Sequence, residues 1–398
     1  MSEALTQPAA TSQPYAGLRM VEFTHMVMGP TCGMVFADLG AEVIKVEPPK
    51  GDNTRKLLGS GAGFYPLFNR NKKSLTLDLK TPEGREAVLK LIATADIVSH
   101  NFRPETMAAQ GLDYASLKRL NPRLIYIALK GFLPGPYEHR TALDEVVQMM
   151  GGLAYMTGPV GQPLRAGSSV NDIMGGMFGA IAAQAALAQR EKTGKGMEVQ
   201  SALFENNVFL VAQHMMQYAV TGVPADPMPN RISAWGVYDV FTVKNGEQIF
   251  LSAVSDKQWT VFCDVLGFAD LKANPAYCDN NARVRERPTL IADLRQRFMA
   301  YTAAELTDIF EKNGLPYAPI KRPEDLMDDP HLVQTGGLAP ITLPNGQQTN
   351  TLLFPFTLDG QRMRVRRNPP KLGEHSADLL QELGYSAEDA ARIGEFKP

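Results

Sequence analysis

One aspartate stands where a glycine- and serine-rich stretch gives way to a helical pattern. Residues 164–170 are typical of a loop, whereas apolar residues recur at helical spacing from Ile173 to Ile181. A helix is therefore expected to begin beside Asp172, whose carboxylate would lie among unpaired backbone N–H groups at the positive end of the helix dipole. Two roles fit such a carboxylate: it caps the helix, as Asp often does, or it acts as a nucleophile in covalent catalysis.

Other residue types that commonly carry catalysis lack the spacing that their chemistry needs. Six dispersed histidines include no H-E-x-x-H pair, and the three cysteines (Cys32, Cys263, Cys278) have no metal-ligand spacing, so no metal site is predicted. No G-x-S-x-G turn is present, which disfavours a serine nucleophile of the α/β-hydrolase type. A carboxylate nucleophile therefore remains a candidate.

The usual nucleotide-binding fingerprints are also missing. The segment that follows the first predicted strand, residues 24–30, does not contain G-x-G-x-x-G, which disfavours a conventional NAD site. The chain has no Walker A motif, so nothing indicates ATP as an energy source.

Seven basic residues cluster in the predicted loops of the first part of the chain. Each alone is typical of a solvated surface charge. Because ligands bind open α/β sheets at the connections between strands and helices, the group as a whole favours an anionic ligand with several phosphates. The seven residues are Arg55, Arg70, Lys72, Lys73, Lys80, Arg103 and Arg140.

Alternating strand and helix patterns must position these residues. Strands are predicted at 18–23, 41–47, 95–100 and 124–129, and helices at 31–39, 83–94 and 114–120. Parallel strands joined by crossover helices account for this alternation. The pattern predicts a doubly wound, Rossmann-like α/β domain.

Length and local composition predict a second, smaller domain. The 398 residues exceed the length at which a single core stops growing. Pro and Gly concentrate from Thr221 to Asn230, and a β-hairpin around Asn245–Gly246 and several helical patterns follow, which favours a small α+β domain. The predicted parts are a flexible leader over 1–15, a large α/β domain over 16–220, the small domain over 221–329, and a C-terminal segment over 330–398 that returns to the large domain.

Charge and hydropathy narrow the class of protein. Hydrophobic residues make up 44% and charged residues 21% of the chain, as in ordinary globular proteins. The formal net charge of -2, without a long basic run, disfavours a nucleic-acid partner. No apolar stretch is long enough to span a membrane, the N-terminal residues do not resemble a signal peptide, and the odd, scattered cysteines indicate a reducing compartment. We expect a cytoplasmic protein.

Several motifs occur in order along nearly the whole chain. The strongest runs from Asp38 to Glu47 and continues with Gly51, Asp52 and Arg55. Others lie at 22–30, at 69–78 with Lys80, at 101–104, at 135–137 with Arg140 and Asp144, at 163–167 before Asp172, at 191–196 and at 372–375. Together they resemble the class III CoA-transferases (CaiB/BaiF type), the family that includes formyl-CoA:oxalate CoA-transferase.

The resemblance implies a fold, an activity and a set of site residues. Subunits of that family have two domains, form open rings and interlock as a homodimer, and their substrates are CoA thioesters and carboxylic acids. The catalytic Asp of the family matches Asp172, and an acidic residue near the reaction centre matches Asp144. His25 and Arg140 are expected as further active-site residues. The positions that match the family's CoA contacts are His25, Met26, Val27, Leu77, Lys80 and Asn101.

The chain departs from the family pattern at two kinds of position. Pro48 and Ala109 stand where the family has basic CoA contacts, so Arg55, Lys72 and Arg103 are expected to supply phosphate contacts instead. The glycine-rich lid of the family should fall at 232–237, but this segment contains one glycine. A mobile lid is therefore not carried over to this chain.

The resemblance implies that Asp172 exchanges CoA between two acids through an aspartyl anhydride and an aspartyl-CoA thioester, without metal, NAD or ATP. A free Asp titrates near ~3.9, so this carboxylate is expected to be ionised at neutral pH. Arg165 or Arg140 could pair with the distal carboxylate of a dicarboxylic acid, because guanidinium–carboxylate pairs are bidentate. Together with the habits of the family, this favours succinyl-CoA as donor and a small dicarboxylate as acceptor.

Two alternatives stay open on the sequence. An α-methylacyl-CoA racemase has the same fold but uses a His directly before the position that matches Asp144; here Leu143 stands there and cannot transfer a proton. A non-catalytic acyl-CoA-binding protein is the other alternative, and the presence of Asp172 at the nucleophile position disfavours it.

Overall fold

The computed structural model describes residues 13–231 and 233–394, which divide into two compact units. The larger unit combines residues 1–225 with residues 330–398, and the smaller unit consists of residues 226–329. Within the leader expected over 1–15, residues 1–12 lie outside the described residues. Tyr15 packs against Phe36 with the ring centroids 5.3 Å apart, so the fold already includes this residue.

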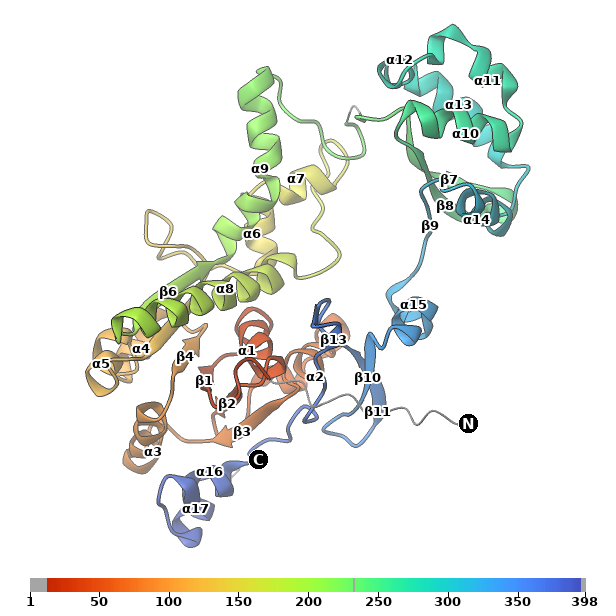
Figure 1. Ribbon diagram of the computed structural model, residues 1–398. Coiled ribbons are helices and arrows are strands. Elements are labelled where there is room, and N and C mark those ends of the chain that lie inside the picture. Colours follow the sequence, from red (N-terminus) through yellow and green to blue (C-terminus); the bar gives the residue numbers. More distant parts are fainter. Residues whose placement is uncertain (1–12, 232, 395–398) are drawn as a thin grey trace, which may run out of the picture. The chain divides into compact units, whose positions relative to one another are not determined.

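A six-stranded parallel sheet forms the centre of the larger unit (Figure 1). The strand order is β3-β2-β1-β4-β5-β6, so the order reverses between β1 and β4, where ligands bind at the carboxyl ends of open sheets. The mixed α/β fold is therefore confirmed. The strands are β1 (Arg19–Phe23), β2 (Glu42–Glu47), β3 (Lys72–Thr76), β4 (Ile97–His100), β5 (Ile125–Lys130) and β6 (Met197–Ala202).

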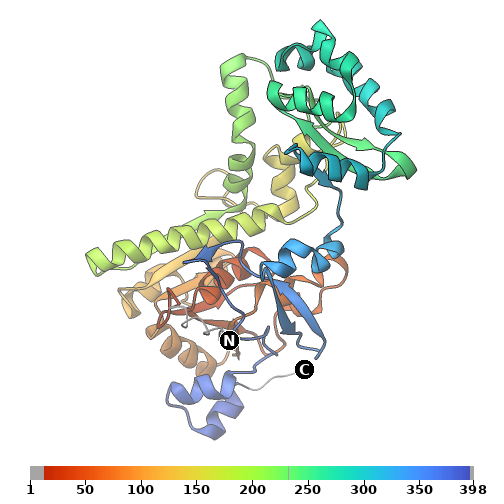
Figure 2. The same ribbon diagram turned by 45° about the vertical axis from the view of Figure 1, so that its right-hand side comes forward.

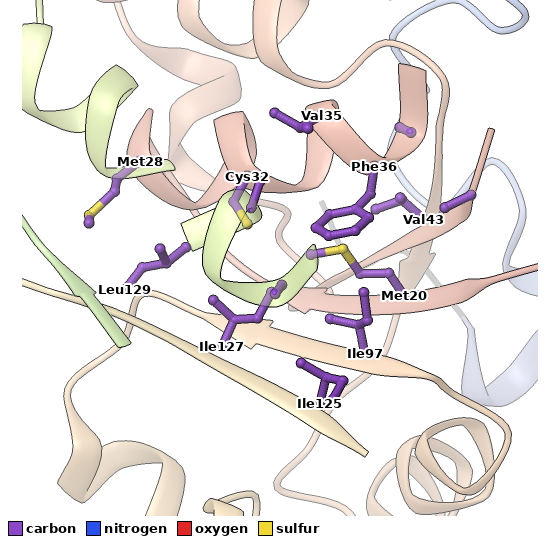
Figure 3. Packing of buried hydrophobic residues seen from close by; sticks show 14 of the residues in the cluster. Met20, Met28, Cys32, Val35, Phe36, Val43, Ile97, Ile125, Ile127 and Leu129 are labelled. Atoms are coloured by element: carbon purple, nitrogen blue, oxygen red, sulfur yellow. The ribbon is translucent and has the colours of Figure 1, made fainter. Parts of the chain in front are cut away.

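Helices cover both faces of this sheet. On one face, α1 (Met28–Asp38) and α8 (Val170–Thr193) pack on residues of β1, β4 and β5, and Figure 3 shows Cys32 and Phe36 close to Met20 and Ile127 in this core. The apolar side chains of the other face, among them Val21, pack against five helices. These are α3 (Pro82–Ala93), α4 (Pro104–Ala109), α5 (Tyr114–Leu120), α16 (Ser376–Glu382) and α17 (Ala387–Ile393).

Local sequence explains several of these boundaries. Pro82 opens α3 at a position where its missing N–H costs nothing, and the Thr81 side chain accepts a hydrogen bond from the Gly84 N–H. Gly194 ends α8 in the left-handed conformation that glycine adopts without strain. The remaining elements of the larger unit are α2 (Phe64–Phe68), α6 (Asp144–Met150), α7 (Leu153–Thr157), α9 (Leu203–Thr221), α15 (Pro330–Gln334), β10 (Leu338–Thr342), β11 (Gln348–Leu352), β12 (Thr357–Leu358), β13 (Gln361–Arg362) and the 3₁₀ turns η1 (Asn53–Lys56) and η2 (Gly59–Gly61).

The smaller unit has its own aromatic core. The predicted hairpin is present as β7 (Val237–Thr242) and β8 (Gln248–Ala253), which pair antiparallel, and β9 (Tyr317–Pro319) pairs with β8. Phe241, Phe262 and Phe298 are fully buried between this sheet and the helices. Those helices are α10 (Asp256–Leu266), α11 (Ala269–Ala273), α12 (Asn280–Arg285), α13 (Arg287–Phe298) and α14 (Ala303–Lys312), with 3₁₀ turns at η3 (Lys244–Gly246), η4 (Pro275–Tyr277) and η5 (Pro323–Asp328).

A helix that spans a lipid bilayer needs about 20 predominantly apolar residues. Within residues 13–231 and 233–394, no helix combines the length and the apolar character that a membrane span requires.

Candidate active site

Asp172 is the third residue of α8 and does not cap it. Ser169 occupies the N-cap position and makes no side-chain capping bond. Instead, the backbone N–H groups of Asn171 and Asp172 donate to Oδ2 of Asp144, which lies on α6, over 2.8 and 3.1 Å. Of the two roles that the sequence left open for Asp172, the capping role is therefore performed by a carboxylate from another helix. The Asp172 carboxylate is left available for chemistry.

The surroundings of Asp172 make its carboxylate hard to ionise. Burial, followed by the negative charge of Asp144, raises the pKa of Asp172 to about 7, and the nearby Arg165 acts in the opposite direction. A free Asp titrates near ~3.9, so the expectation of full ionisation at neutral pH does not hold for this position. Loss of hydration and a like charge outweigh the favourable field of the helix terminus here.

Glycines allow α8 to lie directly against α1. A Cβ atom added at Gly175 would come within 2.5 Å of the end of the Met28 side chain, and one added at Gly176 within 2.5 Å of the Met28 carbonyl oxygen. Any larger side chain at Gly176 would therefore push the two helices apart. Because α1 begins directly after residues 24–27, this contact sets the loop after β1 beside the start of α8.

Side chains from three other segments hold the loop at 24–27. Asn101 accepts a hydrogen bond from the His25 N–H over 3.0 Å and donates to the His25 carbonyl oxygen over 2.9 Å. The Thr54 hydroxyl accepts from the Met26 N–H over 2.8 Å, and Lys45 donates to the Thr24 carbonyl oxygen. Met26 has a φ of 59°, which non-glycine residues rarely adopt, so these bonds stabilise an unfavourable backbone conformation.

Three hollows meet around Phe102, and most of the predicted CoA contacts line them. A hollow of about 260 Å³ is lined by His25 and Met26, among others, and one of about 420 Å³ has a polar lining. A third, of about 210 Å³, lies between β2, β3 and α4. The second is lined by His25, Asn101, Arg103 and Arg140, and the third by Leu77 and Lys80. The ring of Phe102 also lies 5.0 Å from that of His25.

Lys72 does not reach any of these hollows. Its side chain is fully buried and its ammonium donates to Glu22, to the Pro30 carbonyl oxygen and to Asn69, over 2.8, 2.9 and 3.3 Å. These three bonds use all three N–H groups of the ammonium. A phosphate therefore cannot bind to the Lys72 ammonium, which contradicts the phosphate contact predicted for this residue.

Three further predicted site residues have structural partners of their own. The Arg55 guanidinium forms a bidentate pair with Glu47 over two distances of 2.7 Å and lies 3.9 Å above the ring of Tyr65. Val27 is buried in a small apolar cluster with Met34 and Phe68. Arg140 is exposed and stacks on Tyr137 at 4.1 Å.

In the part of the chain that the structure describes, no three His, Cys, Asp or Glu side chains gather as metal ligands would.

A family model supports the relationship that the motifs suggest. The model for CoA-transferase family III matches residues 15–376, which is most of the chain. The chain belongs to CoA-transferase family III. It is therefore a CoA-transferase by family, and CoA thioesters are its substrates.

Relatives and solved structures agree with this assignment. The chain is 34% identical to the succinate–glutarate CoA-transferase of Agrobacterium fabrum, with 93% of this chain and 96% of that protein covered. It is 31% identical to the succinyl-CoA:glutarate CoA-transferase of Homo sapiens, with 96% and 89% covered. Among solved structures, a CAIB/BAIF family protein from Brucella suis matches with a TM-score of 0.83 at 34% identity, covering 93% of this chain and 99% of that one.

Two positioning groups of this family III enzyme were missed by sequence reasoning. Lys45 stands between Ile44 and Val46 in a buried strand, where a charge must be paired, and this signal could have indicated a buried acidic partner. In the structure that partner is Asp52, 3.0 Å away. Gln148 is fully buried beside Asp144. Its spacing of one helical turn from Asp144 gave a weak signal only, because such pairs are also common on exposed helix faces.

Proposed function

We propose that this CoA-transferase moves CoA reversibly from succinyl-CoA to a small dicarboxylic acid, with Asp172 as the residue that carries CoA. The observation that carries the proposal is the position of the half-buried Asp172 carboxylate. It lies at the start of α8, and α8 packs against α1, which follows the loop at 24–27. Relatives named for succinate or succinyl-CoA and glutarate support dicarboxylic substrates.

In the proposed mechanism, Asp172 first attacks the carbonyl carbon of the donor thioester. The C–S bond breaks, which gives a mixed anhydride on Asp172 and free CoA thiolate. The thiolate then attacks the side-chain carbonyl of Asp172, releases the donor carboxylate and forms an aspartyl-CoA thioester. The acceptor carboxylate attacks that thioester, which breaks the C–S bond and gives a second mixed anhydride on Asp172 and free CoA thiolate. The thiolate attacks the acceptor's acyl carbon and expels the Asp172 carboxylate. The new acyl-CoA leaves and the Asp172 carboxylate is regenerated.

This sequence exchanges one thioester for another, so no net proton, electron or phosphate is needed. At each step the negative charge passes from the attacking carboxylate or thiolate to the leaving thiolate or carboxylate. In the mechanism we propose, metal, NAD and ATP therefore take no part.

The polar hollows around Phe102 are the proposed CoA site. Lys80 and Arg103 are exposed at their edges, and Arg103 donates to the Thr141 hydroxyl over 3.0 Å. Both cations suit phosphate oxygens. Asn101, Leu77 and the backbone of residues 25–27 would line the path toward Asp172.

Arginines supply the proposed preference for dicarboxylates. Arg140 lines the hollow that also contains His25, and Arg165 lies close enough to Asp172 to lower its pKa. A guanidinium that binds the distal carboxylate leaves the other end of the acid free to react. Monocarboxylates of equal length lack that contact.

We also propose a homodimer. The larger unit exposes apolar side chains along α8 and α9, and an apolar hollow of about 610 Å³ lies between α1, α8 and residues 352–358. Exposed apolar patches of this kind mark interaction surfaces.

The direct test is Asp172→Asn, which keeps the size and removes the nucleophile. We expect CoA exchange between succinyl-CoA and glutarate to fall at least about 1,000-fold, because the covalent route is lost. With the wild-type enzyme, brief incubation with succinyl-CoA and digestion should reveal a CoA adduct on the peptide that contains Asp172. An Asp172→Asn enzyme with wild-type turnover would contradict the proposal.

The same preparation tests the racemase alternative. A racemase exchanges the proton next to the thioester carbonyl, so it would introduce deuterium from heavy water into 2-methylacyl-CoA. Leu143 provides no acid–base group for that step. We expect no deuterium incorporation, and incorporation at the rate of turnover would favour the racemase.

A further inference from the structure

One fully buried amide joins three segments of the candidate active site. Gln148 on α6 donates from Nε2 to Oδ1 of Asp144, and its Oε1 accepts from the Ala166 N–H over 2.7 Å. The other oxygen of Asp144 accepts from the Asn171 and Asp172 N–H groups. Helix α6, the loop at 163–169 and the start of α8 are thus tied together through two side chains.

The chemistry of the partners determines how this amide must point. Asp144 offers acceptors only, so the NH₂ group of Gln148 must face it, and the Ala166 N–H is a donor, so the carbonyl oxygen must face that. The reverse orientation would place oxygen against oxygen and N–H against N–H. A leucine of similar size could fill the space but would leave the Ala166 N–H and one carboxylate oxygen without partners.

We propose that Gln148 is a positioning residue for CoA transfer: it holds Asp144 on the backbone of Asp172 and fixes the loop that carries Arg165. This proposal rests on the proposed function of Asp172. Gln148 acts through Asp144 and does not touch substrate. A carboxylate that attacks a thioester must approach within a few tenths of an ångström of the correct position, and a misplacement of about 1 Å can cost on the order of 100-fold in rate.

The charges around this junction determine what the substitution Gln148→Glu would do. Asp144 lies one turn away on the same helix, Asp172 is on α8, and Arg165 pairs with Glu145 over 3.4 Å. On the other side, α9 presents Asn207 and Val211 to Gly151 and Gly152 at the end of α6, and both side chains are neutral. A carboxyl group introduced by Gln148→Glu would be buried beside Asp144 and would therefore have a raised pKa.

The first test is kinetic. We expect Gln148→Leu to lower kcat by about 10- to 100-fold while KM for succinyl-CoA stays within about threefold, because the hollows that line the CoA path are not altered. Gln381→Leu, at an exposed position of α16, is the matched control and should keep wild-type kinetics. A wild-type kcat in Gln148→Leu, or a loss confined to KM, would overturn the proposal.

The second test measures how pH changes the activity of Gln148→Glu, so it does not require the Gln148→Leu variant to fold. In Gln148→Glu, the introduced carboxyl group can donate to Asp144 and accept from Ala166 while it is protonated, as the amide does. Once it is ionised, the same group repels Asp144. The ratio of Gln148→Glu to wild-type kcat should therefore rise as pH falls from 8 to 6. A ratio independent of pH would overturn the positioning role, also in the case that Gln148→Leu does not fold.

A third measurement separates this proposal from the proposed function. Amide hydrogen exchange at Ala166, Asn171 and Asp172 should be slow in the wild type and faster in the Gln148 variants, with α3 unchanged. If these amides exchange slowly in a wild-type protein that transfers no CoA, the proposed function is rejected, but the hydrogen bonds of Gln148 and Asp144 to this backbone are still supported. Equal exchange in wild type and variants, with transfer intact, would reject the positioning role alone.

Discussion

The charge state of a single carboxylate links the local geometry to the proposed chemistry. Asp172 lies at the positive end of α8, which favours its anion, but burial and Asp144 favour its neutral form and raise the pKa to about 7. In the proposed mechanism, a proton bound to Asp172 removes the nucleophile. Because the folded pKa is raised, the reactive form is lost as pH falls through about 7, not near the pKa of a free Asp.

Arg165 should tune this titration. It lowers the pKa of Asp172, so Arg165→Gln should raise that pKa and move the acid limb of kcat/KM to higher pH. We expect activity at pH 6 to fall about two- to fivefold more than activity at pH 8.5, measured with a donor and acceptor at fixed subsaturating concentrations. Arg119→Gln, at an exposed position on α5, is the control. An acid limb that stays in place would show that Arg165 does not act on Asp172.

At the scale of elements, the sequence revealed local patterns better than distant contacts. Helix α8 was expected beside Asp172 because helical spacing is visible within a few residues. The cap from Asp144 was not predicted, because 28 residues separate it from Asp172 and nothing in a local pattern reports such a contact. The hollows around Phe102 likewise combine residues from several separate segments.

Strand β3 was missed for an identifiable physical reason. It begins with Lys72 and Lys73, and charged residues normally argue against a buried strand. Here Lys72 is buried only because Glu22 on β1, two strands away, neutralises it. Strand β6 was missed because it follows a basic glycine turn, half of its residues are polar and it lies at the edge of the sheet.

The Lys72–Glu22 pair gives a prediction about stability. Lys72→Met should leave the Glu22 carboxylate buried without its counter-ion and lower the free energy of unfolding by about 3 to 5 kcal/mol. Adding Glu22→Gln should recover part of this loss. Both effects are measured by denaturant unfolding.

The Lys72→Met variant also tests whether Lys72 contacts a CoA phosphate. Because Lys72 is sealed from solvent, we expect KM for succinyl-CoA in the folded fraction of Lys72→Met to stay within about twofold of wild type. A tenfold rise in KM with unchanged stability would restore Lys72 as a CoA contact.

Close packing of α1 and α8 leads to a second prediction at this scale. Gly176→Ala would place a Cβ against the Met28 carbonyl oxygen and the Cys32 N–H, both of which belong to backbone and cannot rotate away. Overpacking of this kind costs about 1 to 3 kcal/mol, and kcat should fall as the loop at 24–27 shifts from Asp172. Gly63→Ala is the control, because nothing lies within 4 Å of its added Cβ. Equal melting temperatures for the two variants would contradict the close contact.

At the scale of the whole molecule, two compact units are joined by two chain crossings, at residues 225–226 and 329–330. The larger unit carries Asp172, Asp144 and the hollows around Phe102. It also leaves much of α9 without a partner; Figure 2 shows this helix projecting away from the sheet. Its exposed apolar residues are Phe209, Leu210, Met215, Met216, Tyr218 and Val220.

A second copy of the chain is the occupant that we expect on this face. Light scattering after gel filtration should give about twice the 43.6 kDa of one chain. Phe209 and Met216 are 67% and 61% exposed, so Phe209→Lys with Met216→Lys should not harm the fold of a lone chain. In a dimer, the same two lysines would be buried without partners and should shift the protein toward the mass of one chain. Leu120→Lys, on α5 at 44% exposure, should leave the mass unchanged. A wild-type enzyme that is active at the mass of one chain would contradict the dimer.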